Sequence, residues 1–577
     1  MGVKYIKRVP PKETELSIEE TGRLAEQCNS FPVLIYALSN RGYTKEQIID
    51  LLQSEKPGLD IITKPLNGSE KAATQIIEKL NFGEGIGIFA DYDCDGITSG
   101  YVMYEGLSEI KKALKSASHI TVHYPQRSDG YGLSTAYCQK IIARKKTGMV
   151  ITVDNGITTR QQCSLLLKNN IVPVVTDHHE PNKKDLPDCT IVNPCYNDLK
   201  RSYLAGVAVS FNVVNTIADM IGIKLNYKKI IPAVAVGTIS DCMPMSYENS
   251  CYIRLGLDMI NNNDEFNFSF LQLMKDSPEM TPKDVSFSVA PKINSASRID
   301  DTRLGAAGFF YEDQNKIMAV IDKLDELNNQ RKQITADARE TVAKINIGDN
   351  ERIVIFDGAN YGKGIHGIIA SEITKRFPDY PAFVYSSFIS SEDGAHICAG
   401  SVRCANTAIN VMSIFEQLKD MHIIRKAAGH SSACVIEVAA DKLDEFIKAF
   451  SSLFDSMEIP LVTIALDGRI SIKEASNQQL LKSINKICFT VQEAPLFGIN
   501  DVFINKVKYS KNNPENICFY FSDNTASKWV WIWGFASKYK ALGSPKQVHL
   551  VCSIEQDFMK KTIISPTLNV IDMIPIA

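Results

Sequence analysis

The chain has 577 residues, of which 45% are hydrophobic and 22% are charged, and its formal net charge at pH 7 is −3. This length exceeds the size of a single hydrophobic core, so we expect about three or four domains. The nearly balanced charge excludes a uniformly basic protein, so any contact with nucleic acid must use local patches. No apolar run approaches the length of about 18 residues that a membrane-spanning helix needs.

The cysteines and the N-terminus indicate the compartment. Fourteen cysteines are scattered along the chain without a CxxC pair. This spacing argues against a zinc ribbon or a disulfide framework, and scattered thiols are typical of a reducing compartment. The N-terminal stretch MGVKYIKRVPPKE lacks the apolar core of a secretory signal. We therefore predict a cytoplasmic protein with no membrane partner.

Short β-rich runs alternate with helical segments between residues 85 and 195. The runs are GIGIFA (85–90), HITVHYP (119–125), MVITV (149–153), IVPVVT (171–176) and TIVNP (190–194). The first, third and fourth runs are continuously apolar, as strands buried on both faces of a parallel sheet are. Helical segments such as TTRQQCSLLLKNN separate the runs, which predicts a doubly wound α/β domain.

Acidic residues and histidines follow three of these predicted strands. They are Asp91, Asp93, Asp95, Asp154, Asp177, His178 and His179. Ligands of open parallel sheets bind at the carboxyl ends of the strands, so we expect these side chains to meet at one edge. A single aspartate at such a place is about as often a helix N-cap. The number of carboxylates at three strand ends favours a metal site instead.

A further aspartate follows the apolar segment IPAVAVGTISDCMPM (231–245), which we expect to begin as a helix and to break at Gly237 before Asp241. An aspartate in this setting is usually a turn residue, and it gains weight only beside the other carboxylates. Mixed Asp and His ligands suit an ion such as Mn²⁺ better than Ca²⁺. The carboxylates outnumber the ligands of one ion, so we expect two ions about 3.5–4 Å apart that share a bridging carboxylate.

The stretches DYDCDG, VDNG, DHH and GTISD, in this order, resemble the DHH phosphoesterase superfamily. The superfamily hydrolyses phosphoanhydrides and phosphodiesters with Mn²⁺ or Mg²⁺. The resemblance implies six metal ligands: Asp91, Asp93, Asp95, Asp154, His178 and Asp241. It also implies that Asp154 bridges the two ions and that His179 lies near the scissile phosphate. Phe89 stands where some members carry a histidine, so the first ion would rely more on Asp91 or water.

Other stretches resemble the RecJ family of single-strand-specific exonucleases. YPQRSDGYGLS (124–134) resembles the segment whose arginine and tyrosine hold the strand end, which implies that Arg127 and Tyr131 bind substrate. APKINSASRID (290–300) resembles PRINAAGR, with Lys292 and Arg298 as the cations.

The second half of the chain continues this resemblance. ICAGSVRCANTAINV (397–411) resembles a GSxR loop that opens a helix, where Ser401 and Arg403 would bind a terminal phosphate. KAAGHSSACVI (426–436) stands in place of GGHxxAAG and retains His430, although these residues alone would favour a helix C-cap with a solvent-exposed histidine.

Residues 352–377, RIVIFDGANYGKGIHGIIASEITKRF, read as a strand followed by a helix and resemble the DHH-associated domain. That domain usually shows the stretch HPGVVGI. Gly362 replaces its histidine here, and His366 stands a few residues later.

The C-terminal part begins with EAPLFGINDVF (493–503), which is similar to the LEPFGxGNPxPxF segment of the RecJ family. Four strand-like runs follow: VFINKVKYS, ICFYFSD, KWVWIWGF and QVHLVCSI. Short strands with polar turns predict a small barrel such as an OB-fold. Its aromatics and lysines are of the kind that stack bases and follow a phosphate backbone. Alternating aromatics in strands more often belong to a core, so we assign no stacking residue.

We therefore predict a multidomain α/β protein with five parts. These are an N-terminal helical extension (1–75), a parallel-sheet DHH catalytic domain (76–310), a long connecting helix (311–347), an α/β DHH-associated substrate-binding domain (348–455) and a C-terminal OB-fold-like β-barrel that binds nucleic acid (456–577).

The resemblance implies a 5′-to-3′ exonuclease that hydrolyses single-stranded DNA with two divalent cations, Mn²⁺ or Mg²⁺, in DNA repair, recombination or replication. The expected catalytic residues are Asp154, His179 and Arg298. Two alternatives stay open: a phosphodiesterase for short oligoribonucleotides or cyclic dinucleotides, and an inactive single-strand-binding replication scaffold. We expect a monomer whose partners include a single-stranded-DNA-binding protein or a helicase.

Overall fold

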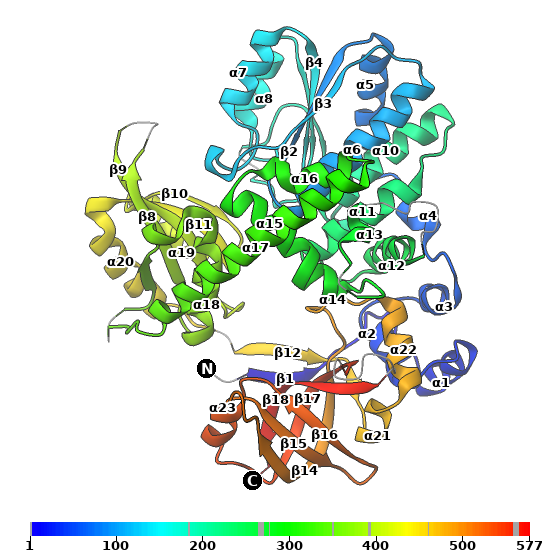
Figure 1. Cartoon of the computed structure of the whole chain (residues 1–577), viewed down its shortest axis with the longest axis vertical. Coiled ribbons are helices and arrows are strands. Elements are labelled where there is room, and N and C mark those ends of the chain that lie inside the picture. The colour runs from blue at the N-terminus through cyan, green and yellow to red at the C-terminus, as the bar shows by residue number, and fades with distance from the viewer. Residues whose placement is uncertain are drawn as a thin grey trace. The chain divides into compact units, whose positions relative to one another are not determined.

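The computed structural model describes residues 3–182, 185–262, 270–275, 277–348, 351–390, 394–459, 461–557 and 565–576 (Figure 1). The chain forms two compact units. Unit 1 comprises Met1–Lys4, Pro125–Gly130 and Pro291–Ile464, and unit 2 comprises Tyr5–Tyr124, Tyr131–Ala290 and Ala465–Ala577. No helix in the described part of the chain combines the length and the apolar character needed to cross a membrane.

Unit 2 contains the predicted parallel sheet. Its strands, in spatial order, are β3 (Ile120–His123), β2 (Gly85–Ala90), β4 (Thr147–Val153), β5 (Val172–Thr176) and β6 (Thr190–Val192). All four ladders are parallel. Every residue of β2 is buried, as the continuous apolar run predicts. The chain runs from β2 to one neighbour and then returns to the other, so β2 and β4 flank the switch point where α/β sheets bind ligands.

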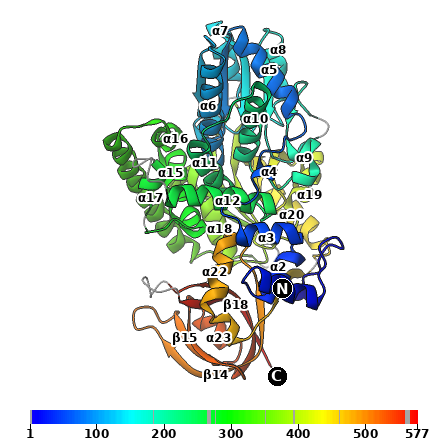
Figure 2. The ribbon, with the colours of Figure 1, turned by 90° about the vertical axis from the view of Figure 1, so that its right-hand side faces the viewer.

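Helices cover both faces of this sheet. They are α5 (Ser69–Asn81), α6 (Cys94–Ala113), α7 (Thr135–Arg144), α8 (Arg160–Leu167) and α10 (Gly206–Ile221). Helices α7 and α8 contact each other on one face, and α10 packs against both α5 and α6 on the other. Figure 2 shows α6 and α10 side by side. The doubly wound α/β prediction is therefore confirmed.

Helix α11 (Tyr227–Ser240) corrects one detail of the sequence interpretation. The helix does not break at Gly237 but continues to Ser240, and Asp241 is its C-cap. A Cβ atom at Gly237 would lie 2.4 Å from Thr98 Oγ1 and 2.7 Å from Val207 Cγ1. The glycine therefore allows α11 to pack closely against α6 and α10, and this packing offsets its low helix propensity.

Unit 2 contains further helical segments. They are α1 (Ile18–Gln27), α2 (Pro32–Asn40), α3 (Lys45–Gln53), α4 (Leu59–Ile62), α9 (Pro194–Asn197), η2 (Leu199–Arg201), α12 (Tyr247–Asn261), α13 (Phe270–Leu273), α14 (Pro282–Asp284) and the π-turn η3 (Val285–Val289).

Unit 1 is built on a mixed sheet. Its strands, in spatial order, are β10 (Ile424–Gly429), β11 (Ala433–Ala439), β9 (His396–Arg403), β8 (Ala382–Ile389) and β7 (Val354–Asp357). Its helices are α15 (Ala290–Ile299), α16 (Thr302–Phe310), α17 (Gln314–Val342), α18 (His366–Arg376), α19 (Val411–Asp420) and α20 (Leu443–Asp455), with short turns η1 (Arg127–Asp129), η4 (Ala359–Tyr361), η5 (Lys363–Ile365) and η6 (Ala440–Lys442).

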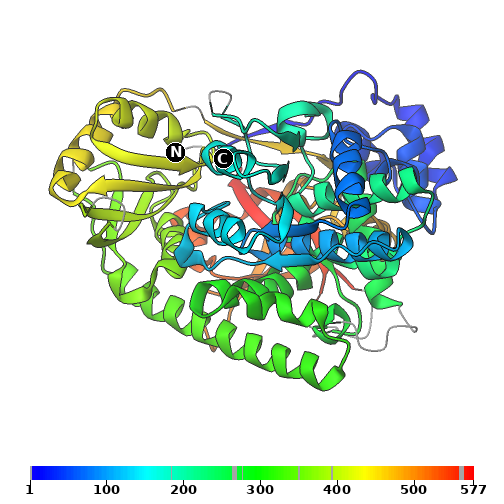
Figure 3. The ribbon, with the colours of Figure 1, turned by 90° about the horizontal axis from the view of Figure 1, so that it is seen from above.

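Successive residues of the central strands point to opposite faces of this sheet. Val384 packs with α17 and α18, whereas Phe383 packs with α19 and α20. The long helix predicted within 311–347 is α17, which has 29 residues and is drawn in green in Figure 3.

One local prediction and one alternative interpretation in unit 1 are wrong. Ser401 and Arg403 do not lie in a loop that opens a helix but in β9, which pairs with β8 on one side and β11 on the other. This pairing satisfies both edges of the strand and leaves the segment no freedom to turn. His430 does not follow a helix C-cap, because Gly429 ends strand β10.

The C-terminal sheet belongs to unit 2. Its strands are β13 (Gly468–Arg469), β14 (Phe497–Tyr509), β15 (Ile517–Ser522), β16 (Ser527–Ile532), β17 (Gln547–Gln556) and β18 (Pro566–Pro575), accompanied by α21 (Ile472–Ala475), α22 (Gln478–Ile487) and α23 (Ala536–Ala541). The spatial order is β16-β15-β14-β17-β18. The predicted β-domain is present, but among the described residues no ladder joins β16 to β18, so hydrogen bonds do not close it into a barrel. Strands β1 (Val3–Lys7) and β12 (Val462–Leu466) form a separate two-stranded sheet.

Candidate metal centre and phosphate-binding residues

The first acidic group follows β2 and begins α6. Asp91 is the residue after β2, and Asp93 caps α6 by accepting a hydrogen bond of 3.1 Å from the Gly96 N–H. Asp95 lies in the first turn of α6, and its carboxylate accepts the N–H groups of Gly206 at 2.8 Å and Val207 at 3.0 Å. The start of α10 therefore holds the Asp95 carboxylate in place, since the first N–H groups of a helix have no partner within it.

Asp154 follows β4 in a left-handed conformation, with φ +60°. This conformation costs a residue with a side chain about 1–2 kcal/mol. Its N–H donates to the Thr176 carbonyl at 3.0 Å, which ties the turn to β5. Asn155 steadies the same turn, because its side-chain amide donates to the Phe89 carbonyl at 3.2 Å and to the Val153 carbonyl at 2.9 Å.

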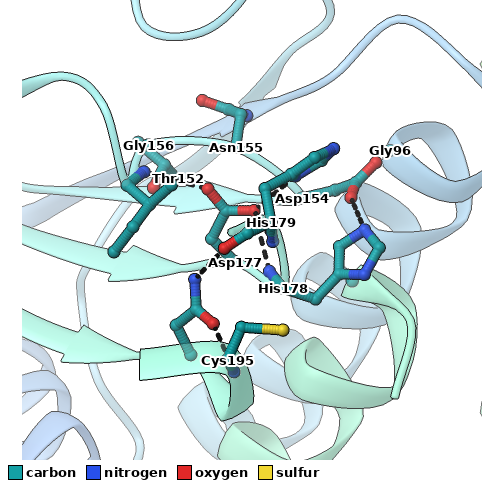
Figure 4. Close-up of polar contacts among 12 residues, drawn as sticks. Gly96, Thr152, Asp154, Asn155, Gly156, Asp177, His178, His179 and Cys195 are labelled. Carbon is teal, nitrogen blue, oxygen red and sulfur yellow. Dashed lines mark hydrogen bonds and ion pairs between the residues drawn. The ribbon is translucent and has the colours of Figure 1, made fainter. Parts of the chain in front are cut away.

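His178 brings three of the carboxylates together. Its Nε2 lies 3.1 Å from Asp154 Oδ1, 3.6 Å from Asp241 Oδ2 and 3.8 Å from Asp95 Oδ2. These residues come from the ends of β5, β4 and α11 and from the start of α6. The predicted convergence of Asp and His side chains at one edge of the sheet therefore exists (Figure 4).

The metal-ligating atoms form three overlapping groups. In each group they lie within 4.8 Å of one another: Asp91, Asp93 and Asp154; Asp95, His178 and Asp241; and Asp154, His178 and His179. All six expected metal ligands belong to these groups. Asp154 and His178 each belong to two groups, so the geometry fits two neighbouring divalent ions with a shared carboxylate.

The electrostatics of the centre also fit cations. Burial and the neighbouring Asp241 raise the pKa of Asp95 to about 7, and burial and Asp93 raise the pKa of Asp241 to about 7. Burial and Asp95 raise the pKa of Asp154 well above its usual value. Burial lowers the pKa of His178 to about 4, so the imidazole is neutral and able to ligate a metal. Divalent cations would remove the penalty that this crowding imposes on the carboxylates.

Asp177 has a positioning role that the sequence did not specify. Its carboxylate accepts the N–H groups of Ile157 at 2.9 Å, His178 at 2.8 Å and His179 at 3.2 Å, and it lies 2.7 Å from His179 Nδ1. Burial alone would raise the pKa of Asp177, but His179 and these donors lower it to about 2. In turn, Asp177 overcomes the effect of burial on His179 and raises its pKa to about 9. The only sequence signal was its place between β5 and the two histidines.

Tyr131, predicted to bind substrate, lies beside His179. Its hydroxyl is 3.1 Å from His179 Nδ1 and 3.2 Å from Nε2. The two rings meet edge to face, with centroids 5.6 Å apart. Asp177, His179 and Tyr131 thus form a continuous chain of contacts that leads from the interior to a half-exposed tyrosine.

Three predicted phosphate ligands of unit 1 also come together. A Cβ atom at Gly367, in the first turn of α18, would lie 2.8 Å from Arg403 Nη2 and 3.7 Å from Ser401 Oγ. Burial and the nearby Arg127 lower the pKa of Arg403. A helix start beside two guanidinium groups is an anion-binding arrangement.

The two other predicted substrate contacts, Lys292 and His430, and the predicted catalytic residue Arg298 also lie in unit 1. Lys292 Nζ forms an ion pair of 2.9 Å with Asp325 Oδ1 on α17, and Arg298 donates from Nη1 to the Gly364 carbonyl at 2.8 Å. His430 is exposed just after β10.

The replacement of a histidine by Gly362 has a local explanation. Gly362 has φ +76°, a conformation that favours glycine. His366 does not replace the missing histidine at the surface, because its side chain is buried. Its Nε2 lies 3.2 Å from both the Gly358 carbonyl and Ser386 Oγ. This histidine therefore joins η4, α18 and β8.

Comparison with known proteins agrees with this geometry. Residues 85–238 match the model of the DHH family, N-terminal domain. The chain is 26% identical over 446 residues to the single-stranded-DNA-specific exonuclease RecJ of Bacillus subtilis, covering 75% of this chain but only 53% of that protein. It is 28% identical over 478 residues to RecJ of Dickeya dadantii, covering 78% of each. The crystal structure of RecJ in complex with Mn²⁺ from Thermus thermophilus matches with a TM-score of 0.79 at 20% identity, over 100% of this chain and 80% of that one.

Residues 85–238, which contain the whole parallel sheet, thus resemble the N-terminal domain of the DHH family. Over about three quarters of its length the chain is similar in sequence to RecJ proteins, and its fold is that of the Thermus thermophilus RecJ structure.

Proposed function

We propose that the protein is a metal-dependent exonuclease that hydrolyses the phosphodiester bonds of single-stranded DNA from the 5′ end. The observation that carries this proposal is the set of three overlapping carboxylate and histidine groups around Asp154 and His178. The RecJ relatives, which are named as single-stranded-DNA-specific exonucleases, support the choice of substrate. The proposed cofactors are two divalent cations, Mn²⁺ or Mg²⁺, held by Asp91, Asp93, Asp95, Asp154, His178 and Asp241.

When bound, the cations supply an activated water and neutralise charge on the phosphoryl oxygens. The residues of the chain set the geometry for that chemistry. Asp154, fixed by the turn after β4, would be one of the carboxylates that hold these cations. His179 is cationic at neutral pH because Asp177 holds it, so it donates a hydrogen bond to a phosphoryl oxygen whose charge grows in the transition state.

The polarity of digestion would come from recognition of the terminal phosphate. Ser401, Arg403 and Arg127 offer a hydroxyl and two guanidinium groups beside the start of α18. A 5′ phosphate carries more negative charge than an internal phosphate, so its interaction with these guanidinium groups is more favourable. Tyr131 would contact the strand next to His179. Lys292 and His430 remain predicted strand contacts, and Arg298 remains a predicted catalytic cation.

We propose further that the enzyme acts as a cytoplasmic monomer with a single-stranded-DNA-binding protein or a helicase. An exonuclease restricted to single strands requires a partner that exposes or protects them. The five predicted domains would divide this work between catalysis, substrate binding and strand binding.

End-labelled substrates test the proposal. With Mn²⁺, a single-stranded oligonucleotide labelled at the 5′ end should release its label as a mononucleotide from the first turnover. Release only from the 3′ end, or equal digestion of blunt duplex, would contradict the proposed polarity or strand preference. Faster turnover of a dinucleotide than of a long oligomer would favour the phosphodiesterase alternative. Failure to bind Mn²⁺ would favour the inactive scaffold.

A further inference from the structure

Two cysteines lie side by side between α8 and β6. Cys163 is in the first half of α8 and is fully buried, whereas Cys189 directly precedes β6 and is half-buried. Both pack in one hydrophobic cluster with Val175 of β5 and Ile191 of β6. All fourteen cysteines of the chain are free thiols, so this pair is reduced in the structure.

The two thiols interact with each other. A side-chain hydrogen bond from Cys189 lowers the pKa of Cys163 and outweighs the opposite effect of burial. The same hydrogen bond, together with burial, raises the pKa of Cys189. Cys163 Sγ also lies 3.7 Å from Thr159 Oγ1. The thiolate is the form of cysteine that reacts with oxidants, and in this pair the Cys189 thiol stabilises it at Cys163.

A cysteine without such a neighbour behaves differently in this chain. Cys488 is as accessible as Cys189, but burial raises its pKa to about 12, and its thiol donates to the Asn485 carbonyl at 3.4 Å. A thiol with a raised pKa in apolar surroundings is inert and serves only packing. The lowered pKa of Cys163 therefore needs more than the ordinary packing role of a core cysteine to account for it.

Both cysteines belong to segments that hold Asp177. Ile157, which packs in the same cluster and precedes α8, donates its N–H to the Asp177 carboxylate at 2.9 Å. On the other side, the Asp177 N–H donates to the carbonyl of Val192 in β6 at 3.1 Å. Asp177 is therefore hydrogen-bonded both to the segment that leads to Cys163 and to the strand that follows Cys189.

We propose that Cys163 and Cys189 form an oxidation site, at which a peroxide converts the two thiols into a disulfide and lowers the activity of the metal centre. The disulfide itself is independent of the proposed function, whereas its effect on activity rests on that function. Cys189, which is half-buried, gives a small oxidant access to the pair.

The reaction consumes one hydrogen peroxide molecule and both thiols. The Cys163 thiolate attacks one peroxide oxygen, the O–O bond breaks and hydroxide leaves, so Cys163 becomes a sulfenic acid. The Cys189 sulfur then attacks the Cys163 sulfur, and the S–O bond breaks as the S–S bond forms. Two electrons pass from the sulfur atoms to the peroxide. The hydrogens of the thiols join those of the peroxide in two water molecules.

The disulfide should displace Asp177. A covalent bond between two sulfur atoms is shorter than the hydrogen bond that it replaces, so its formation draws the start of α8 toward the start of β6. Asp177 is bonded to both sides and must shift with them, and it orients His179. Displacing a reacting group by about 1 Å can lower a rate by about 100-fold. We therefore expect Mn²⁺ to bind as before and activity to fall by about 10- to 100-fold.

Peptide mapping without reduction tests the site. The full-length protein is treated with a small molar excess of hydrogen peroxide, catalase removes the remainder, and free thiols are alkylated before digestion. We expect a pair of peptides joined through Cys163 and Cys189 that separates after treatment with dithiothreitol. Absence of this pair, or a link from Cys163 to Cys138 of α7 in its place, would overturn the proposal.

Activity measurements on variants test the consequence. Hydrolysis of a labelled single strand should fall by about tenfold or more after peroxide and recover with dithiothreitol. Cys189→Ser should keep its activity in peroxide, because Cys163 then lacks both its disulfide partner and the thiol that lowers its pKa. Cys163→Ala should behave in the same way. Cys488→Ser, the half-buried control, should respond to peroxide like the unmodified protein. Far-UV circular dichroism confirms that each variant is folded.

The remaining outcomes separate this inference from the exonuclease proposal. Equal losses of activity in Cys189→Ser and in the unmodified protein would overturn the role of the pair. Complete formation of the disulfide without loss of activity would overturn the effect on Asp177. A protein that forms the linked peptides but never hydrolyses DNA would support the oxidation site while the exonuclease proposal fails.

Discussion

The imidazole of His178 lies with its Nε2 3.1 Å from Asp154 Oδ1, so the ends of β5 and β4 deliver a histidine and a carboxylate to one point. Both side chains are buried, and the pKa of each is shifted toward its neutral form. Such a pair is poorly placed to stabilise the fold by itself, whereas it is well placed to ligate a cation.

Asp154→Asn should abolish the binding of at least one Mn²⁺ ion and lower exonuclease activity by about three orders of magnitude, the scale of losing a preorganised electrostatic group. The same variant should make the metal-free protein more stable, because it removes one of several crowded carboxylates. Calorimetric titration with Mn²⁺ and thermal unfolding in EDTA measure these effects. Asp60→Asn, at an exposed aspartate of α4, is the control. An unchanged Mn²⁺ stoichiometry in Asp154→Asn would contradict the metal assignment.

Asp177→Asn should retain Mn²⁺ binding but lower activity by about 10- to 100-fold, as expected for a residue that orients other functional groups. The amide keeps the shape of the carboxylate but loses the charge that holds His179 cationic. The ratio of kcat to KM and the Mn²⁺ stoichiometry are measured together. Asp185→Asn, at an exposed position in the same loop, should leave both unchanged. Full activity of Asp177→Asn would show that His179 needs no orienting anion.

Gly206→Ala should weaken Mn²⁺ binding, because the new Cβ would lie 2.5 Å from Asp154 Oδ1 and must displace the carboxylate. The overlap should also destabilise the protein by about 1–3 kcal/mol. Gly22→Ala is the matched control, since Gly22 lies in α1 with nothing within 4 Å of its Cβ position. That change should stabilise the protein by about 0.5–1 kcal/mol. Equal effects of the two variants on Mn²⁺ affinity would contradict the close approach of α10 to Asp154.

Arg403→Lys should raise KM for a 5′-phosphorylated oligonucleotide by about 10- to 100-fold, the range of one charge-assisted hydrogen bond. Lysine keeps the positive charge but lacks the planar guanidinium group, which donates hydrogen bonds to two phosphate oxygens at once. The KM for a 5′-hydroxyl oligonucleotide should change much less, and this comparison is the essential measurement. Arg352→Lys, whose guanidinium pairs with Asp455 on the surface of unit 1, serves as the control. An equal rise in KM for both oligonucleotides would exclude a terminal-phosphate site at Arg403.

The free energy of unfolding should fall as the pH drops below about 6.5, because His366 takes up a proton more readily in the unfolded chain. Burial lowers the pKa of this histidine, and Lys363 lowers it further, against the opposing effects of the Gly358 carbonyl and Asp357. The folded protein therefore keeps the ring neutral, whereas the unfolded chain takes up a proton below its usual pKa. The neutral His366 ring contributes fully to the free energy of unfolding above the usual pKa of histidine. Below that pKa the free energy of unfolding falls by up to about 1.4 kcal/mol per pH unit.

Urea unfolding between pH 7.5 and 5.5 measures this effect. His366→Gln should start from a lower stability, because the buried contacts are altered, but should show a shallower decline with falling pH. A decline as steep as that of the unmodified protein would assign the pH dependence to other groups.

The parallel sheet could be predicted from the sequence because its pattern is local. The continuously apolar runs that became β2, β4 and β5, and the helical segments between them, are recognisable within short windows. The carboxylates at their ends followed from one general property, namely that parallel strands end at the same edge of a sheet. The length and place of α17 were predictable for a similar reason.

Other features depended on partners that are distant in the chain. The helix α11 passes through Gly237 because of its packing on α6 and α10, and the segment of Ser401 and Arg403 is a strand because β8 and β11 pair with it. Asp177 can orient His179 because the Ile157 N–H, which lies in another loop, donates a hydrogen bond to its carboxylate. The exposure of the C-terminal tryptophans was decided by which face of the C-terminal sheet forms the core.

The amino-acid sequence by itself determined the α/β class, the carboxylate and histidine residues proposed as metal ligands, and the strand ends that carry them, because local periodicity and chain order encode these. Only the tertiary structure decided which carboxylates approach a common histidine, which aspartate accepts the N–H groups of the two histidines, and which aromatics face solvent. Those outcomes depend on distances between residues far apart in the chain, and a linear pattern does not contain such distances.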